Sequence, residues 1–378
     1  MSYLKEIAPK LLSYRLTRWG IRRPAMPLNL TFSVTNLCQS KCKTCSIWQL
    51  YREHPQKYHS ELSTREIEKI FKSMGHIYVF NISGGEPFLR PDIVQIIELA
   101  CKYLTPGIIH IPTNAISPRL IIKRVDQIVT LLKRNHPHVR LTIKPSLDHI
   151  GDKHDEIRGV KGNFEKVMWL YKRLKALKPH YPNLHVELGT VISRWNVNDI
   201  DEISKFVQTL GPDSYRNEIA EQRSEMFNQQ DPITPDPQAY RNAIDFFVAQ
   251  IKENNRKKVL FQRITNAFRL VYYHLAIRIM EQNRQVIPCY AGISNVHMTP
   301  YGDIWPCCTL GYDQSMGNLR NFEYDFKGLW ISETARQIRR FIYEKKCACP
   351  LANQAYSNIL MHPPSLLRVL REILISKG

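Results

Sequence analysis

A repeating alternation of short β-rich runs and amphipathic helical segments constrains the fold of this chain more than any other feature. The six candidate strands are residues 30–35, 77–82, 107–113, 139–145, 185–192 and 213–220. The helices expected after them include residues 91–103, 118–134, 163–177 and 197–210. Units of this kind build a parallel sheet that is covered by helices. The alternation therefore predicts an α/β fold, and specifically a partial (β/α)6 barrel of the TIM type.

The remaining sequence divides at changes of composition. Ser63 and Glu66 have the spacing of a capping box at a helix start. After Ala220, the proline-bearing stretch 231–237 marks a boundary, two helical segments (238–254 and 261–283) follow, and residues 296–305 read as a hairpin that turns at 301–303. We expect a basic amphipathic N-terminal helix (1–29), the barrel (30–230), a helical linker (231–285), a small cysteine-bearing domain (286–350) and a C-terminal amphipathic helix (351–378).

The nine cysteines fall into two groups with one outlier. Their odd number argues for metal ligation rather than a disulfide framework. The outlier, Cys101, lies in an apolar stretch and is expected to be a buried, inert thiol. The sequence has no run of 18 uninterrupted apolar residues and no secretory signal at its N-terminus. We therefore expect an intracellular, cytoplasmic protein.

The first cysteine group, Cys38-x3-Cys42-x2-Cys45, directly follows the first predicted strand. Three thiolates from one tight loop at the carboxyl end of a barrel strand suit an iron–sulfur cluster with one open iron. A zinc site and unrelated surface thiols are the alternatives, although zinc usually takes four ligands.

The run Thr35-Asn-Leu-Cys38-Gln-Ser-Lys-Cys42-Lys-Thr-Cys45 resembles the signature loop of the radical S-adenosylmethionine (SAM) superfamily. The resemblance extends over about residues 30–220. It implies a 4Fe-4S cluster that binds SAM and cleaves it reductively to a 5′-deoxyadenosyl radical, which abstracts hydrogen from an unactivated carbon. One departure is Thr44, where relatives often have an aromatic residue before the last cysteine, although Trp48 is near in the sequence.

Further motifs fall where this family has SAM contacts. The resemblance implies cofactor-binding roles for a GGEP motif after the second strand, for polar residues after the fourth, and for a segment of the fifth. These residues are Gly84, Gly85, Glu86, Pro87, Ser146, Asp148, Ile192 and Asn196. Glycines permit close backbone approach, and Glu86 offers an acceptor to an ammonium group. For Arg158, both a structural ion pair and a substrate contact are open. Three charged residues near the sixth strand, Glu218, Glu221 and Arg223, are expected to be solvated loop residues. The alternative is that they face the cavity of the barrel.

The second cysteine group resembles the SPASM/Twitch extension of radical SAM enzymes. Gly302-x4-Cys307 has the interval of that family, whereas Cys347-x-Cys349 departs from its usual Cys-x2-Cys. The resemblance implies one fully ligated auxiliary 4Fe-4S cluster on Cys289, Cys307, Cys347 and Cys349, with Cys308 as a spare or alternative ligand. We therefore expect a small C-terminal Fe-S domain of the Twitch-like kind. Four cysteines also suit tetrahedral zinc.

The formal net charge of +19 predicts attraction to polyanions. Both ends of the chain combine basic and apolar residues, which suits either an interfacial helix or a helix packed on the barrel. The N-terminal set is Leu4, Lys5, Ile7, Lys10, Leu11, Leu12, Tyr14, Arg15, Leu16, Arg18, Trp19, Arg22 and Arg23, against the single acid Glu6. The C-terminal set is Leu366, Leu367, Arg368, Val369, Leu370, Arg371, Ile373 and Leu374. These ends favour peripheral contact with an anionic membrane at its inner face.

The substrate is the most open question at the level of sequence. The basic ends make a membrane lipid, lipid-linked or similar amphiphilic molecule the leading hypothesis. The alternatives are a peptide maturase of the ribosomal-peptide type, a sugar-alcohol dehydrogenase, and a non-enzymatic Fe-S protein that binds nucleic acid. Fewer than 30 residues precede the barrel, which argues against a leader-peptide-binding domain. We expect a reductant such as ferredoxin or flavodoxin as partner, and no nucleic acid.

Overall fold

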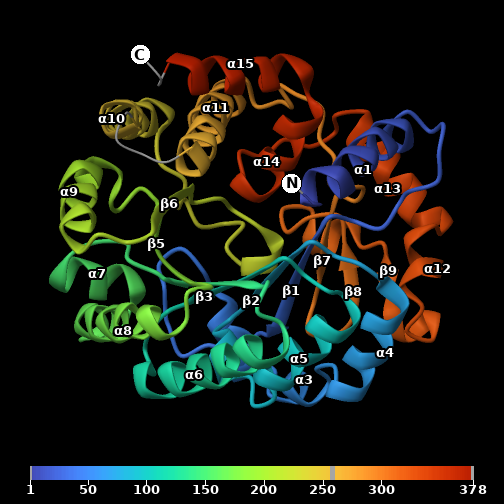
Figure 1. Ribbon diagram of the computed structural model, residues 1–378, viewed down its shortest axis with the longest axis horizontal. Helices are drawn as coiled ribbons and strands as arrows, with labels where there is room; N and C mark the ends of the chain where they lie inside the picture. The colour runs from blue at the N-terminus through green and yellow to red at the C-terminus, as the bar shows by residue number, and fades with distance from the viewer. Residues whose placement is uncertain (1, 256–259, 376–378) are drawn as a thin grey trace.

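One sheet of nine strands forms the centre of the protein, for which a computed structural model describes residues 2–255 and 260–375. The strand order is β6-β5-β4-β3-β2-β1-β7-β8-β9. Its first six strands are β1 (Asn29–Thr35), β2 (Val79–Gly84), β3 (Ile108–Thr113), β4 (Arg140–Pro145), β5 (Leu184–Ile192) and β6 (Ser214–Ile219). All pair in parallel and curve into part of a barrel (Figure 1). The predicted α/β class, partial barrel and six strands are confirmed.

Six helices cover the outer face of this curved sheet (Figure 1). They are α4 (Thr64–Met74), α5 (Ile93–Tyr103), α6 (Pro118–Asn135), α7 (Gly151–Arg158), α8 (Asn163–Leu177) and α9 (Ile200–Leu210). The capping box predicted at the start of α4 is present, since Ser63 and Glu66 satisfy each other's backbone amides. Cys101 is 3% exposed in α5, as predicted.

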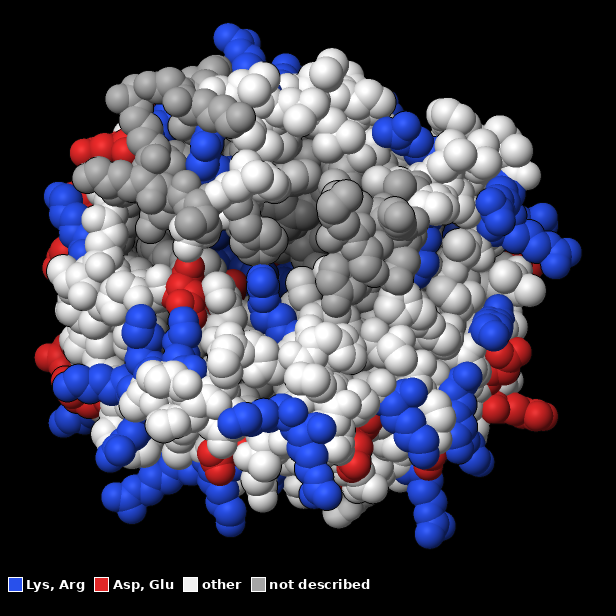
Figure 2. Space-filling model, in the orientation of Figure 1, with Lys and Arg blue, Asp and Glu red and all other residues white. Residues whose placement is uncertain are grey.

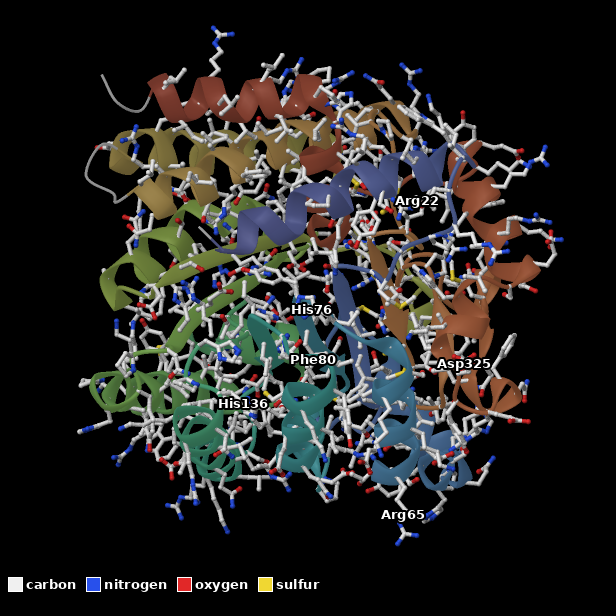
Figure 3. The ribbon with its side chains drawn as sticks, turned by 45° about the vertical axis from the view of Figure 1, so that its right-hand side comes forward. Arg22, Arg65, His76, Phe80, His136 and Asp325 are labelled. Atoms are coloured by element: carbon white, nitrogen blue, oxygen red, sulfur yellow. The ribbon has the colours of Figure 1, made fainter. Side chains whose placement is uncertain are left out.

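The strands alternate between an apolar face and a polar face. Phe32 and Phe80 are fully buried, and their rings contact Phe71 of α4 at centroid distances of 6.2 Å and 5.7 Å. Phe80 lies inside the molecule, whereas Arg65 of α4 extends away from it (Figure 3). Successive strand residues point to opposite sides, so Ser33 and its neighbours of the same parity point into the barrel. The interior of this barrel is therefore polar.

The cysteine-bearing C-terminal region continues the barrel sheet. Strand β7 (Asn295–Met298) pairs in parallel with β1, in a register that places His297 beside Thr31. Strands β8 (Asp303–Trp305) and β9 (Gly317–Asn318) then add antiparallel neighbours. The predicted hairpin is confirmed, but its attachment to the first barrel strand was not predicted from the sequence. Helices α12 (Phe326–Trp330) and α13 (Glu333–Tyr343) flank these strands (Figure 1).

A layer of helices lies across the open side of the barrel (Figure 1). It contains α10 (Pro237–Asn255), α11 (Leu260–Gln282), α14 (Ala352–Met361), α15 (Pro363–Ile375) and the N-terminal α1 (Ser2–Arg18). Tyr14 of α1 is fully buried in a small second core with Leu28, Tyr290, Ile293 and Met361. The side chains of residues 1–8 lie outside the described part of the chain. Along the described residues, none of the helices has both the length and the apolar character needed to cross a membrane.

Candidate active site

The loop after β1 carries Cys38, Cys42 and Cys45 and is anchored on one side by the end of α7. Backbone amides of Lys41 and Lys43 donate to the carbonyls of Arg158 (3.1 Å) and Ile157 (2.9 Å). The left-handed Gly159, which ends α7, lies so close to this loop that a Cβ atom there would be 2.3 Å from the Lys41 carbonyl oxygen. The loop geometry thus depends on main-chain contacts with a distant element.

The other side of the cysteine loop is held by the segment that follows β6. The amide of Ser46 donates to the Met226 carbonyl (2.9 Å), and the Asn228 side chain donates to the Thr44 carbonyl (2.8 Å). Trp48, the nearest aromatic residue in the sequence, has the cations of Lys41 and Arg52 over its ring, at 5.9 Å and 4.8 Å from the centroid.

The chemistry of the first three thiols fits a metal cluster. Burial raises the pKa of Cys38 and that of Cys45 to about 12, and the negative charge of Cys42 adds to both shifts. Three thiolates so close together repel one another and lose hydration, so they need cationic metal to hold the ionised form. The Arg158 guanidinium lies nearby and favours ionisation of Cys38.

The GGEP motif joins the cysteine loop to the end of β2. A Cβ atom on Gly84 would lie 2.1 Å from the Thr35 carbonyl oxygen, and one on Gly85 would lie 2.4 Å from that of Leu37. Amides of Gly85 and Glu86 donate to those same two carbonyls, each over 2.8 Å. The two glycines therefore allow the end of β2 to approach the cysteine loop closely. The sequence did not reveal this reason for the presence of glycine.

Glu86 is 1% exposed, and both of its carboxylate oxygens already accept hydrogen bonds from the protein. The donors are the amide of Phe88 (3.2 Å), the hydroxyl of Thr113 (3.0 Å) and the amide of Asn114 (2.7 Å). Burial nevertheless raises the pKa of Glu86 to about 7, although these donors lower it. The carboxylate thus ties the ends of β2 and β3 together, with Pro87 beside it, and its contact with SAM stays a prediction.

Asp148 and Asn196 form a buried hydrogen-bonded centre between the ends of β4 and β5. Asp148 accepts from Arg158 (3.1 Å) and from the amide of Val191 (2.9 Å). Asn196 donates to the carbonyls of Asp148 (2.8 Å) and Val191 (3.0 Å). The structural ion pair that was open for Arg158 is present, since its guanidinium lies 3.1 Å from the Asp148 carboxylate.

Two predicted cofactor-binding residues differ in their surroundings. Ser146 is half-buried at the end of β4, where its backbone bridges to Gly189. Ile192 is fully buried in the hydrophobic core, and its carbonyl accepts from the Ala220 amide (2.8 Å). The side chain of Ile192 therefore packs in the core, as β-strand patterning favours, and its prediction as a SAM contact carries less support than that of Ser146.

A group of charged side chains inside the barrel was not identified from the sequence. Glu187 lies 3.4 Å from Arg216 and 3.7 Å from His110, and Lys144 lies 3.8 Å from Glu218. Arg216 and Glu218 lie deep in the molecule, yet 33% and 32% of their side chains are accessible, so solvent reaches them inside the barrel. Figure 2 shows a hollow near the centre of this face with Lys or Arg atoms inside it. The sequence signal that could have identified this group is the alternation of charged and apolar residues along β4–β6.

The second cysteine group converges on one largely apolar cavity. Cys289, Cys307, Cys347 and Cys349 all line it, together with aliphatic residues such as Ile287. Burial is the main cause that raises the pKa of each thiol, to about 11 for Cys347. The Gln285 amide lies 3.4 Å from the Cys347 sulfur. This set of four convergent thiols fits a fully ligated cluster.

Cys308 is turned away from that cavity. Its sulfur accepts a hydrogen bond from the Arg223 guanidinium (3.1 Å), and Arg223 also reaches Glu225 (3.4 Å). The expectation that Glu218, Glu221 and Arg223 are solvated loop residues is wrong. Glu218 lies on β6 and faces the interior of the barrel, and Glu221 and Arg223 lie deep in the molecule because the chain after β6 turns inward.

Comparisons with known proteins agree with both halves of this arrangement. The Radical SAM superfamily model matches residues 32–207, and the SPASM iron-sulfur cluster-binding domain model matches residues 289–350. The antilisterial bacteriocin subtilosin biosynthesis protein AlbA of Bacillus subtilis is 23% identical over 361 residues, covering 92% of this chain and 70% of AlbA. The AdoMet-dependent heme synthase of Oleidesulfovibrio alaskensis is 24% identical over 349 residues, covering 84% and 78%.

A solved structure shares the fold. Streptococcus suis SuiB bound to precursor peptide SuiA superposes with a TM-score of 0.59 at 18% identity, over 89% of this chain and 71% of SuiB. SuiB bound to S-adenosylmethionine has the same TM-score. The first cysteine group follows β1, and Cys289 and Cys307 of the second flank the adjacent β7–β8 hairpin of the same sheet. This chain is a radical SAM superfamily enzyme that uses SAM and 4Fe-4S clusters and carries a SPASM-type iron–sulfur domain.

Proposed function

We propose that this enzyme modifies a peptide, as a maturase of ribosomally made peptides. The observation that carries the proposal is the likeness to a bacteriocin biosynthesis protein over 92% of this chain. The shared fold with a protein solved with its precursor peptide supports the same class of substrate. The interior of the barrel offers charged and hydrogen-bonding groups to a polar chain, among them Lys144, Arg216 and Glu218.

In this proposal each group of site residues has a distinct role. Cys38, Cys42 and Cys45 hold the SAM-binding cluster, which supplies the electron that cleaves SAM to a carbon radical. Gly84, Gly85, Glu86 and Pro87 fix the cysteine loop and border the SAM site, with Ser146, Asp148, Ile192 and Asn196 at the ends of β4 and β5. The barrel walls exclude bulk water and orient the substrate. Cys289, Cys307, Cys347 and Cys349 hold the auxiliary cluster.

The lipid substrate that led at the level of sequence has no support from the relatives. Two relatives that match 92% and 84% of this chain are named for a bacteriocin and for heme. The polar, charged barrel interior also disfavours an acyl chain, because an apolar group would displace water from these charged side chains without replacing its hydrogen bonds. A peptide therefore replaces the lipid as the leading substrate.

The test is coexpression of the enzyme with each short open reading frame that flanks its gene, followed by mass spectrometry of the peptide products. We expect one peptide to lose two hydrogens or gain a crosslink. The variant Cys42→Ala, which removes a cluster ligand, should leave that peptide unmodified. If the purified enzyme yields 5′-deoxyadenosine from SAM with dithionite and yet changes no peptide, the peptide proposal fails while the radical chemistry stands.

We also propose that an acidic one-electron carrier of the ferredoxin or flavodoxin type reduces the first cluster. Lys41 is exposed and sits between two of the cysteines in the sequence. Lys43 follows Cys42 and pairs with Glu156 at 2.5 Å. Cations this close to the cluster loop steer an acidic partner toward it.

Peripheral contact with an anionic membrane is a separate proposal about location. On α15, Leu367, Leu370 and Leu374 are 66%, 55% and 63% exposed. Their spacing places them on one helix face, and the exposed Arg368 and Arg371 flank them. An apolar stripe bordered by arginines suits an anionic lipid surface.

A further inference from the structure

The segment from Arg223 to Asn228 forms a direct link to the loop that carries the first three cysteines. The Met226 carbonyl and the Asn228 side chain hold residues on both sides of Cys45, through the Ser46 amide (2.9 Å) and the Thr44 carbonyl (2.8 Å). Asn228 also accepts from the Arg223 amide (2.7 Å), which closes the segment on itself. We call residues 223–228 the bridge segment.

The same bridge segment contacts the loop that follows Cys307. The Arg223 guanidinium donates to the Cys308 sulfur over 3.1 Å. Gly311 lies against the bridge so tightly that a Cβ atom there would be 2.4 Å from the Ser224 hydroxyl. The rings of Phe227 and Tyr312 are 5.9 Å apart. The bridge segment is therefore packed between the two cysteine-bearing loops.

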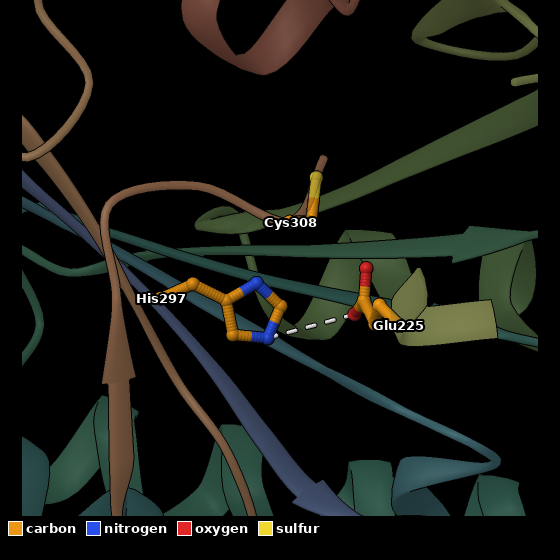
Figure 4. A group of neighbouring side chains, drawn as sticks. All are labelled: Glu225, His297 and Cys308. Atoms are coloured by element: carbon orange, nitrogen blue, oxygen red, sulfur yellow. Dashed lines mark ion pairs between the residues drawn. The ribbon is translucent and has the colours of Figure 1, made fainter. Parts of the chain in front are cut away.

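Glu225, His297 and Cys308 meet beside this bridge (Figure 4). Their potential ligand atoms lie within 4.8 Å of one another, and His297 lies 3.5 Å from Glu225. The Arg223 guanidinium already bonds to both Cys308 and Glu225, and the His297 ring bonds to the Ser33 hydroxyl (2.8 Å). A fixed organic cation thus occupies the place that a metal ion would need, which argues against a third metal site.

We propose that the Arg223 guanidinium supplies a fixed positive charge between the two cluster sites and thereby sets their reduction potentials. In this proposal Cys308 anchors the guanidinium and is not a cluster ligand. The inference rests on the two cysteine groups holding clusters. It is independent of whether the substrate is a peptide.

The direction of the effect follows from electrostatics. Accepting an electron makes an iron–sulfur cluster more negative, so a nearby cation stabilises the reduced form and raises the reduction potential. Arg223 sits next in space to Cys308, whose sequence neighbour Cys307 lines the auxiliary cavity. The bridge segment that carries Arg223 also contacts the first group, at the residues on either side of Cys45. Solvent screens such a buried charge only weakly.

The first experiment is an anaerobic redox titration of the reconstituted enzyme, followed by electron paramagnetic resonance. In Arg223→Gln we expect the midpoint potential of at least one cluster to shift to a more negative value, and Arg223→Lys should shift it less. Arg241→Gln is the matched control, because Arg241 also pairs with a glutamate, Glu281, but on the exposed faces of α10 and α11. Potentials in Arg223→Gln equal to those of Arg241→Gln would overturn the proposal.

The second experiment separates anchoring from ligation. Cys308→Ala removes the sulfur that accepts from Arg223 and leaves the charge in the chain. We expect an unchanged iron content with a smaller negative shift in potential. Cys307→Ala is the comparison, and it should lose the iron of the auxiliary cluster. Loss of that iron in Cys308→Ala would show ligation by Cys308 and overturn its role as anchor.

Discussion

His154 is held in its neutral form by two defined hydrogen bonds. Its Nδ1 atom accepts from the Asp148 amide (3.1 Å), and its other ring nitrogen faces the Asn163 carbonyl oxygen (3.2 Å). The first bond requires an unprotonated Nδ1, so the second must use the Nε2–H. Burial lowers the pKa of His154 to about 4, while nearby Asp148 opposes that shift.

This predicts a pH dependence of stability with a definite sign. The folded pKa of His154 lies below its unfolded value of 6.5, so the unfolded chain binds the proton first as the pH falls. The contribution is fully present above the unfolded pKa and is lost as the pH falls toward about 4, with a maximum of about 3 kcal/mol. Urea unfolding followed by circular dichroism between about pH 5 and about pH 7.5 measures it.

In His154→Gln, the free energy of unfolding should depend less on pH across that window than in the wild type. The exposed His138→Gln is the control and should keep the wild-type slope. Equal slopes for His154→Gln and the wild type would contradict the assignment of a neutral, buried His154.

Gly85 makes a steric prediction that concerns the first cluster. A Cβ atom there would meet main-chain atoms of Asn36 and Leu37 at 2.4–2.8 Å, and backbone does not yield as a flexible side chain does. Gly85→Ala should cost about 2 kcal/mol of stability and reduce the iron of the first cluster. Iron analysis and electron paramagnetic resonance measure this, with the auxiliary cluster as internal reference.

Gly107→Ala is the matched substitution for Gly85→Ala. Its Cβ atom would meet the side-chain ring of Tyr78 at 2.6 Å and not main-chain atoms, at the opposite end of the strands from the first three cysteines. We expect full iron content in that variant. If Gly85→Ala retains as much first-cluster iron as Gly107→Ala, the glycine is not required for the geometry of the loop.

At the scale of elements, α1 is a docked helix and not a free arm. Tyr14 is fully buried and donates to the Met26 carbonyl (2.7 Å). Arg18 donates to the Cys289 carbonyl (3.0 Å), and its guanidinium lies over the rings of Tyr290 and Tyr343 at 5.5 Å and 4.9 Å. The helix therefore packs on the auxiliary domain, beside one of its predicted cluster ligands.

Tyr14→Ala should loosen this helix. Removal of a fully buried tyrosine costs about 3 kcal/mol, so the partly buried Arg15 and Arg18 of this helix should become accessible to trypsin. Limited proteolysis measures the rate of cleavage there. Leu12→Ala on the same helix is the control, because Leu12 is 60% exposed. Equal cleavage rates in the two variants would refute the docking of α1 through Tyr14.

Elements governed by local pattern were predictable, and those governed by distant contacts were not. Residues 163–177 were predicted as a helix and form α8 with the same bounds, since the spacing of its apolar residues is a local signal. The pairing of β7 with β1 joins His297 to Thr31 across most of the chain, and nothing in either segment specifies a partner so remote. The bridge segment escaped prediction because its charged residues read as solvated until the chain turned them inward.

The candidate site divides in the same way. The cysteine spacings identified both groups, and the choice of Cys289, Cys307, Cys347 and Cys349 over Cys308 agrees with the cavity that these four line. Three features depend on how neighbouring strands are placed: the steric need for glycine at Gly84 and Gly85, the hydrogen-bond partners of Glu86, and the charged interior of the barrel. These features required coordinates, because sequence spacing within one strand does not say which side chain lies opposite.

At the scale of the whole molecule, the net charge of +19 and the helix layer over the barrel bear on where the enzyme works. In Figure 2, white surface follows the upper edge where α15 lies, with Lys and Arg atoms at its margin. Leu367, Leu370 and Leu374 remain exposed there after the helix has packed its other face through Val369, which is 3% exposed. Folding thus leaves an apolar stripe within a basic surface.

This arrangement predicts binding to anionic vesicles but not to neutral ones, measured by sedimentation of the cluster-loaded enzyme. Replacing Leu367, Leu370 and Leu374 together by serine should weaken binding about tenfold or more, because each leucine contributes roughly 1 kcal/mol or more when buried in lipid. Ile331→Ser, at another residue that is 49% exposed, is the control. Added salt should weaken binding in the wild type, since arginines such as Arg368 contribute by charge. Wild-type enzyme that stays in the supernatant with anionic vesicles would overturn the membrane proposal, and a triple variant that sediments as the wild type does would show that the leucine stripe is not the binding surface.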